Sequence, residues 1–78
     1  MKSKLLAIIK RLEAMMEAET QETQVRRFEA DGVERCVITY HPQDNELGTF
    51  ELTETATNQT YQFDDIDLVA MEIYELLQ

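Results

Sequence analysis

Hydrophobic and polar residues first follow a helical period along this chain. From Ser3 to Met16 the apolar residues recur every three or four positions, a spacing typical of an amphipathic helix that Ser3 is placed to cap. One face, about 160° wide, is predicted to be buried. It consists of Leu5, Leu6, Ile8, Ile9, Leu12, Met15 and Met16. Lysines come early and glutamates late, against the helix dipole, so we expect both helix ends to fray.

The period then changes from helical to alternating. Ala18 to Gln24 is read as a frayed turn and linker, and Val25–Ala30 and Val33–Tyr40 flank an Asp31-Gly32 pair, which predicts a hairpin. Phe28 can share the helix-covered face with Cys36 only if the loop holds an odd number of residues. We therefore predict a three-residue loop over 30–32, with Gly32 as a bulge glycine in the left-handed region.

Two further strands are predicted after this hairpin. His41-Pro42 should end the second strand, since proline lacks the amide that a sheet requires, and Gln43 to Gly48 reads as a polar loop. Thr49–Thr53 alternates again, with its apolar residues inward. After a turn over 55–60 comes a short fourth strand, and the residues predicted to point inward on these two strands are Phe50, Leu52, Tyr61 and Phe63.

The chain closes with a second predicted helix, capped by Asp64 or Asp65. Its inner face is predicted to hold Ile66, Val69, Ala70, Ile73, Leu76 and Leu77. Leu68, Met71 and Tyr74 lie on the other side, among acidic residues, so this helix is apolar nearly all round. Helices of that kind are usually covered twice, and in so short a chain we expect the second cover to come from another subunit.

These elements predict an α+β fold of the order α-β-β-β-(β)-α. An antiparallel meander of three to four strands carries the N- and C-terminal helices packed on one face. The chain of 78 residues has room for a single domain, 1–78. We expect one core that holds Ile8, Leu12, Ile38, Phe50 and Ile73. A core this small is marginal, and with one cysteine no disulfide can compensate, which favours oligomerisation.

Charge is unevenly distributed along the sequence. Residues 1–35 hold all seven Lys and Arg and seven acids, whereas residues 36–78 hold nine acids and carry the whole net charge of −9. An acidic surface disfavours nucleic-acid binding. Arg26, Arg27 and Arg35 of the hairpin are nevertheless candidates for anion binding, although Glu29 and Glu34 can neutralise them.

No residue pattern in the chain indicates catalysis or a cofactor. Cys36 is a candidate nucleophile or redox sensor, but its mid-strand position favours a small buried apolar group. His41 lies five strand residues away, about 16 Å, so the two cannot form a dyad within one chain. Asp64, Asp65 and Asp67 are candidate Mg²⁺ or Ca²⁺ ligands, for which helix capping is the simpler explanation. We therefore expect neither an enzyme nor a bound metal.

Several runs of residues together form a pattern known from other proteins. They are Phe28 to Gly32, Cys36, Tyr40, Thr49 to Thr53, Tyr61, Phe63-Asp64, Ile66-Asp67, Glu72-Ile73 and Glu75 to Gln78. In these runs the chain resembles the YkuJ-like family of small uncharacterised bacterial proteins. The resemblance runs from about residue 28 to the C-terminus and is looser in the first helix. It departs in the loop 41–48 and the turn 54–60. It implies a compact α+β fold, a homo-oligomer and a bacterial cytoplasmic setting, and it implies no activity.

The sequence supports three hypotheses of function. The first is a small cytoplasmic interaction or regulatory module, homodimeric through Leu68, Met71 and Tyr74, with no membrane segment and with room for a protein partner. The second is a nucleic-acid or anion-binding module that uses the basic hairpin, which predicts salt-sensitive binding. The third is an enzyme whose site forms between subunits, and it requires a pocket that holds several polar groups.

Overall fold

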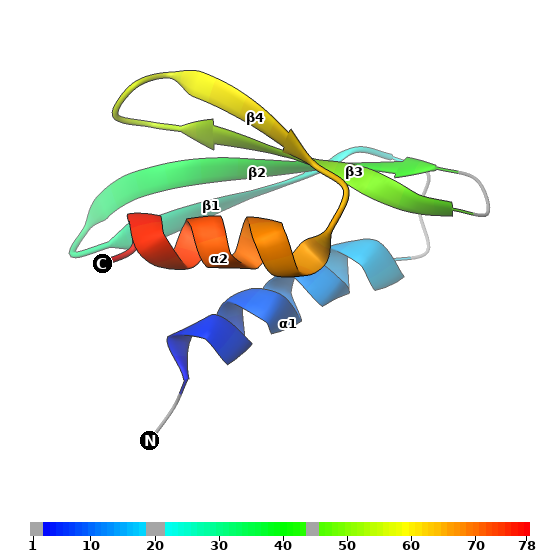
Figure 1. Cartoon of the computed structure of the whole chain (residues 1–78), viewed down its shortest axis with the longest axis horizontal. Coiled ribbons are helices and arrows are strands. Elements are labelled where there is room, and N and C mark those ends of the chain that lie inside the picture. Colours follow the sequence, from blue (N-terminus) through cyan, green and yellow to red (C-terminus); the bar gives the residue numbers. More distant parts are fainter. Residues whose placement is uncertain (1–2, 19–21, 44–45) are drawn as a thin grey trace.

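A computed structural model of the chain describes residues 3–18, 22–43 and 46–78. Its elements are α1 (Lys4–Glu17), β1 (Gln24–Ala30), β2 (Val33–Gln43), β3 (Glu46–Glu54), β4 (Gln59–Phe63) and α2 (Ile66–Leu76). The strands form one antiparallel sheet in the order β1-β2-β3-β4, and both helices lie on the same side of it (Figure 1). The predicted α+β order is confirmed, with the fourth strand present.

Both helices begin at the side chains that the sequence indicated. The Ser3 hydroxyl accepts a hydrogen bond from the amide of Leu6 at 3.1 Å. At the start of α2, Asp65 Oδ1 accepts from the amides of Asp67 and Leu68 at 2.8 and 3.3 Å. Asp65, rather than Asp64, is therefore the cap. In both helices the cap satisfies amides that have no partner within the first turn.

A single core lies between the two helices and the sheet. Its buried members are Ile8, Leu12, Met15, Phe28, Cys36, Ile38, Tyr40, Phe50, Leu52, Val69, Ala70 and Ile73. The five residues expected to share one core all belong to it. Two residues of the predicted apolar faces are not buried: Leu6 is 51% exposed, and Tyr61 is 41% exposed although it pairs with the buried Leu52 and so lies on the helix-covered face. Leu6 lies about 120° around α1 from Leu12, and Tyr61 lies on β4, which has no strand on its outer side.

The hairpin satisfies the parity requirement in a different way from the one predicted. Asp31 and Gly32 have φ values of 54° and 78°, and Ala30 pairs directly with Val33. The turn therefore has two residues, both in the left-handed region that a type I′ turn requires, and the three-residue loop is wrong. The odd residue is in β2 instead. Phe28 pairs with Cys36 and Glu29 with Glu34, which leaves Arg35 as a β-bulge.

The second strand continues through Pro42, so the prediction that it ends at His41-Pro42 is wrong. Beyond Tyr40, which pairs with Gln24 at the start of β1, β2 pairs with β3 alone. Its register shifts between His41 and Gln43, so Pro42 sits where no paired amide is needed. The predicted loop 43–48 is therefore largely strand, and its residues 44–45 lie outside the described part, as do residues 19–21 of the predicted linker.

Gly48 is the one glycine of the sheet, and its neighbours explain the residue type. Its amide donates to the buried hydroxyl of Tyr40 at 3.0 Å. A Cβ atom at this position would collide with the carbonyl oxygen of His41 and lie 2.7 Å from the Tyr40 hydroxyl. The close approach of β3 to β2 at this point therefore requires glycine. It also gives the buried Tyr40 hydroxyl a hydrogen-bond partner.

Candidate functional site

The outer face of α2 carries three large apolar side chains that the chain itself leaves uncovered. Leu68, Met71 and Tyr74 are 56%, 57% and 38% exposed, and their spacing of three places them in a stripe along the helix. The opposite face of α2 buries Val69 and Ile73 against the sheet. The exposure of these side chains agrees with the sequence expectation, whereas their role in a subunit contact stays a prediction.

The neighbouring helix α1 extends this outer surface. The two helices pack against each other, and both lie below the sheet in the view of Figure 1, with α1 running obliquely to α2. The exposed side chain of Leu6 lies about 140° around α1 from Arg11, and therefore on the side of α1 away from β1. Lys10 is also exposed on the outer side of α1. We call the outward side of the two helices, with Leu6, Lys10, Leu68, Met71 and Tyr74, the helix-layer surface.

The structure does not bring Arg26, Arg27 and Arg35 together. Arg27 is on the open face of the sheet, where its Nη1 lies 2.8 Å from Glu34 Oε1. Arg26 turns back on its own strand and donates to the carbonyl oxygen of Val25 at 2.8 Å. Arg35 is the bulge residue and lines a cleft with Glu54, Leu76 and other residues at the end of α2. The three guanidinium groups therefore do not form one anion site.

The Arg27–Glu34 ion pair changes the titration of Glu34 on this side of the sheet. The hydrogen bond and charge of Arg27 lower the pKa of Glu34, and a hydrogen bond from Thr55 at 3.2 Å acts in the same direction. The neutralisation that the sequence suggested for Glu34 is thus present. A phosphate at Arg27 would compete with this carboxylate, so the geometry gives no support to the basic-hairpin hypothesis.

Cys36 is a structural residue rather than a reactive one. It has no exposed surface and lies in the core beneath both helices. Burial raises the pKa of its thiol to about 11, and the negative charges of Glu34, Glu54 and Glu72 add to the effect. Reactive thiols have a lowered pKa and access to solvent, and Cys36 has neither. The expectation that it is a small buried apolar group is confirmed.

His41 lies on the other side of the sheet from Cys36. Its Nε2 is 2.9 Å from Glu51 Oε1 on β3, and its side chain is 41% exposed. Cys36 faces the helices, whereas His41 faces the open side, so the two do not form a dyad. Over residues 3–18, 22–43 and 46–78, acidic, histidine and cysteine side chains form no group of three or more that could hold a metal ion. No helix in the described ranges is long and apolar enough to cross a membrane.

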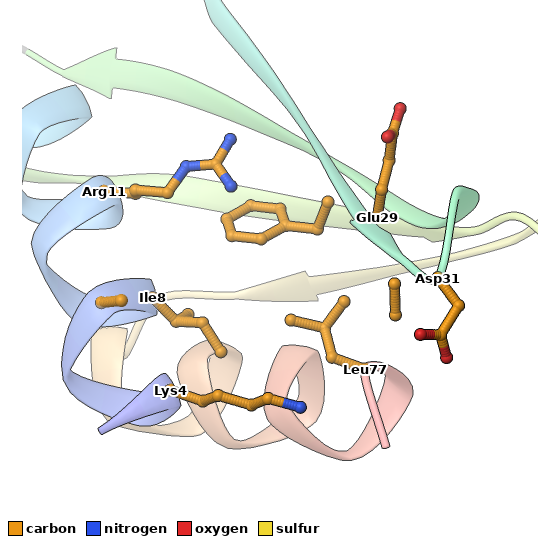
Figure 2. A pocket seen from close by; sticks show the side chains of 9 residues that line it. Lys4, Ile8, Arg11, Glu29, Asp31 and Leu77 are labelled. Atoms are coloured by element: carbon orange, nitrogen blue, oxygen red, sulfur yellow. The ribbon is translucent and has the colours of Figure 1, made fainter. Parts of the chain in front are cut away.

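One cavity combines an apolar floor with charged side chains at its rim. It has a volume of about 340 Å³ and lies between α1, β1 with its turn, and the end of α2 (Figure 2). Its lining residues are Lys4, Ala7, Ile8, Arg11, Phe28, Glu29, Ala30, Asp31 and Leu77. Sequence reasoning did not find this site, although a signal was present. Lys4 and Arg11 are seven residues apart and share one side of the helix with Ile8.

The comparisons with known proteins agree on one family. The family described as "Protein of unknown function (DUF1797)" matches residues 8–77. The "Uncharacterized protein YkuJ" of Bacillus subtilis (strain 168) is 40% identical over 81 residues, covering 97% of this chain and 99% of that protein. The X-ray structure of the YkuJ protein from Bacillus subtilis superposes with a TM-score of 0.85 at 40% identity, again covering 97% and 99% of the two chains. The chain therefore belongs to the YkuJ-like family of proteins of unknown function.

Proposed function

We propose that the protein is a homodimeric interaction or regulatory module of the cytoplasm, without catalytic activity, whose subunits meet through the helix-layer surface. The observation that carries this proposal is the exposed stripe of Leu68, Met71 and Tyr74 on a helix whose other face already buries Val69, Ala70 and Ile73. Fully burying a large apolar side chain from water gives about 1.5–3 kcal/mol, and because these three are about half exposed, each would gain roughly half of that. The single buried thiol, Cys36, fits a reducing compartment.

The charges beside the stripe favour a second copy of this chain as the occupant. Asp67 and Glu75 flank the stripe, and α2 contains no basic residue. Lys10 on the outer side of α1 makes no ion pair within the described part of the chain. A two-fold axis places the same patch on both subunits, and an axis that passes between α1 and α2 would set Lys10 of each copy opposite the acidic α2 of the other.

The size of the chain also supports dimerisation. A core of twelve buried residues in a domain below about 80 residues leaves little net stability after the chain entropy is subtracted. Covering Leu68, Met71 and Tyr74 between subunits would add a second apolar layer on the outer side of α2. Met and Tyr are also enriched at subunit contacts relative to the remaining surface.

Sedimentation velocity on the native chain and two matched variants tests the proposal. Native protein at micromolar concentration is expected to sediment as a dimer. Met71→Glu places a charge in the centre of the stripe, so dimer affinity is expected to fall at least tenfold. Val25→Glu makes the same kind of change at another exposed apolar residue, 47% exposed on the open face of the sheet, and should leave the dimer intact.

The outcomes separate the helix-layer surface from other contacts. A native protein that stays monomeric at all concentrations contradicts the proposal. So does a Met71→Glu variant that remains dimeric while Val25→Glu dissociates, because the contact would then be the open face of the sheet. Circular dichroism of each variant shows whether the fold itself is retained.

A further inference from the structure

The cavity of Figure 2 has the composition of a small-molecule site. Its floor is apolar and includes the buried side chains of Ile8 and Phe28 together with Ala30 and Leu77. Its volume of about 340 Å³ lies at the lower end of the roughly 300–1,000 Å³ found for ligand clefts. It faces β1, on the opposite side of α1 from the helix-layer surface, so it is independent of the proposed subunit contact.

Two cations at the rim have no carboxylate partner. Lys4 and Arg11 project from successive turns of α1, on either side of Ile8 (Figure 2). The ion pairs found among residues 3–18, 22–43 and 46–78 are Arg27–Glu34 and His41–Glu51, and neither involves these two. Lys10, Arg26 and Arg35 also lack an ion pair in the described ranges, but Lys4 and Arg11 are distinguished by lining one cavity together.

The guanidinium of Arg11 is held in place before any ligand binds. It lies 4.1 Å from the centre of the Phe28 ring, a cation–π geometry. Its Nη2 donates to the carbonyl oxygen of Arg27 at 3.1 Å. A guanidinium has five N–H donors, so most of them remain for a ligand. A preorganised donor loses less entropy on binding.

Acidic side chains restrict the charge that the cavity can accept. Asp31 lies across the cavity from α1, on the β1–β2 turn, and Glu29 lies at the rim with its carboxylate turned away from Leu77 (Figure 2). A ligand with one negative charge can face the cations of α1. A dicarboxylate with an acid group at each end would bring its second negative charge toward Asp31, where repulsion opposes binding.

We propose that this cavity binds a small monocarboxylate with an aromatic or branched apolar body. The carboxylate accepts hydrogen bonds from Arg11 and faces the ammonium group of Lys4. Hydrogen bonds between an ionised donor and a carboxylate are stronger than those between neutral groups. The apolar body covers the floor formed by Ile8, Phe28 and Leu77. Both parts are needed, because the cations alone are exposed to water and the floor alone is small.

A titration followed by amide NMR tests the site, with 3-phenylpropionate as the probe. Saturable shifts are expected for the amides of Ala7, Ala30 and Leu77, with a Kd of about 1 mM or tighter. Two matched probes separate the contributions: 3-phenylpropanamide lacks the charge, and succinate lacks the apolar body. Each is expected to bind at least fivefold more weakly. The amide loses the charge-assisted hydrogen bonds, and succinate loses the burial of the phenyl ring on the apolar floor.

Three variants assign the effect to individual residues. Lys4→Gln should weaken binding of 3-phenylpropionate severalfold, whereas Lys10→Gln, on the outer side of α1, should not change it. Asp31→Asn should tighten binding by about two- to fivefold because it removes a negative charge, and asparagine tolerates the positive φ of 54° at this position.

Several results would overturn the proposal. They are the absence of saturable shifts up to about 10 mM probe, equal affinity for the acid and its amide, or shifts that map to the Arg35 cleft rather than to this cavity. Equal weakening by Lys4→Gln and Lys10→Gln would do the same, because it would mean that net charge and not the site attracts the probe.

Discussion

The two helices of this protein have equivalent inner faces and different outer faces. Leu12 of α1 and Ile73 of α2 are both without exposed surface, and each lies in the centre of its buried face. Outward, α1 presents Lys10 and other charged residues, and its one large exposed apolar side chain is Leu6. Outward on α2, Leu68 and Met71 are each more than half exposed, and Tyr74 continues the stripe.

This difference shows that packing of the single chain explains only some of the apolar residues of α2, namely those on its inner face. Packing on the sheet requires one apolar stripe per helix, and α1 stays close to that requirement. The sequence of α2 holds a second stripe, which a monomer gains nothing by exposing. The comparison therefore separates residues that the fold needs from residues that a subunit contact needs, and substitutions can test each set.

The largest expected effect concerns the inner faces. Leu12→Ala and Ile73→Ala each leave a cavity in the same core, so each should lower the free energy of unfolding by about 2–5 kcal/mol. Urea unfolding followed by circular dichroism measures both. Similar losses would confirm that the two inner faces are equivalent.

A matched change on the outer face of α2 sharpens this result. Leu68→Ala should cost little at low protein concentration and more as concentration rises, because a contact between subunits follows mass action. If Leu68→Ala costs as much as Ile73→Ala at every concentration, the outer stripe belongs to the fold of the monomer and the comparison fails.

A smaller effect on the free energy of unfolding comes from titration of the Cys36 thiol. Charged side chains of opposite sign on α1 and α2 act on its pKa. Arg11 lowers and Glu72 raises the pKa of Cys36, whose folded value is about 11 against an ordinary 9.0. Between these pH values the folded state keeps a proton that the unfolded state releases. Stability should therefore fall as the pH rises from 9 to 11, by about 1.4 kcal/mol for each pH unit.

Unfolding curves at several pH values check this expectation, with two variants as controls. Cys36→Ala removes the thiol and should remove most of the loss in this range, apart from titration of tyrosines and lysines. Glu72→Gln should reduce the loss slightly, since Glu72 contributes less than burial to the shift in pKa. A native protein and a Cys36→Ala variant with identical pH dependence would show that the thiol titrates normally.

The periods of the sequence were sufficient to predict the architecture. The change from a helical to an alternating period locates α1 and the strands, and short polar side chains locate both caps, because Ser3 and Asp65 each precede an apolar helical pattern. The placement of both helices on one side followed from the single apolar face of the strands. Leu6 and Tyr61 were expected to be buried but are exposed. Periodicity indicates the direction of a side chain, but it does not indicate how far the core extends in that direction.

The irregularities of the sheet were beyond sequence reasoning. An odd residue in the hairpin was required, but a three-residue loop and a bulge at Arg35 satisfy the same parity, so the sequence alone does not distinguish them. A proline such as Pro42 normally ends a strand because it has no amide hydrogen to donate. Here β2 no longer has β1 as a neighbour at Pro42, and the register between β2 and β3 shifts at this residue, so no amide donor is needed there. Both outcomes depend on which strands are neighbours at that point.

The candidate sites differed in how far the sequence could reveal them. The stripe on α2 lies within one helix, so a wheel is enough to identify it. Arg26, Arg27 and Arg35 were grouped because they share a hairpin, but alternation and the bulge direct them to different places. The cavity beside Arg11 combines three separate elements, and only the tertiary structure brings these together.

The central claim is that the outer face of α2 meets a second copy of the chain, and intermolecular NOEs test it most directly. A dimer formed from equal amounts of ¹³C-labelled and unlabelled protein restricts isotope-filtered NOEs to contacts between subunits. We predict such NOEs between the methyl groups of Leu68 and Met71 and the ring of Tyr74 in the other subunit. Intermolecular NOEs confined to the open face of the sheet, or to β4, would contradict the account, as would a monomer without any.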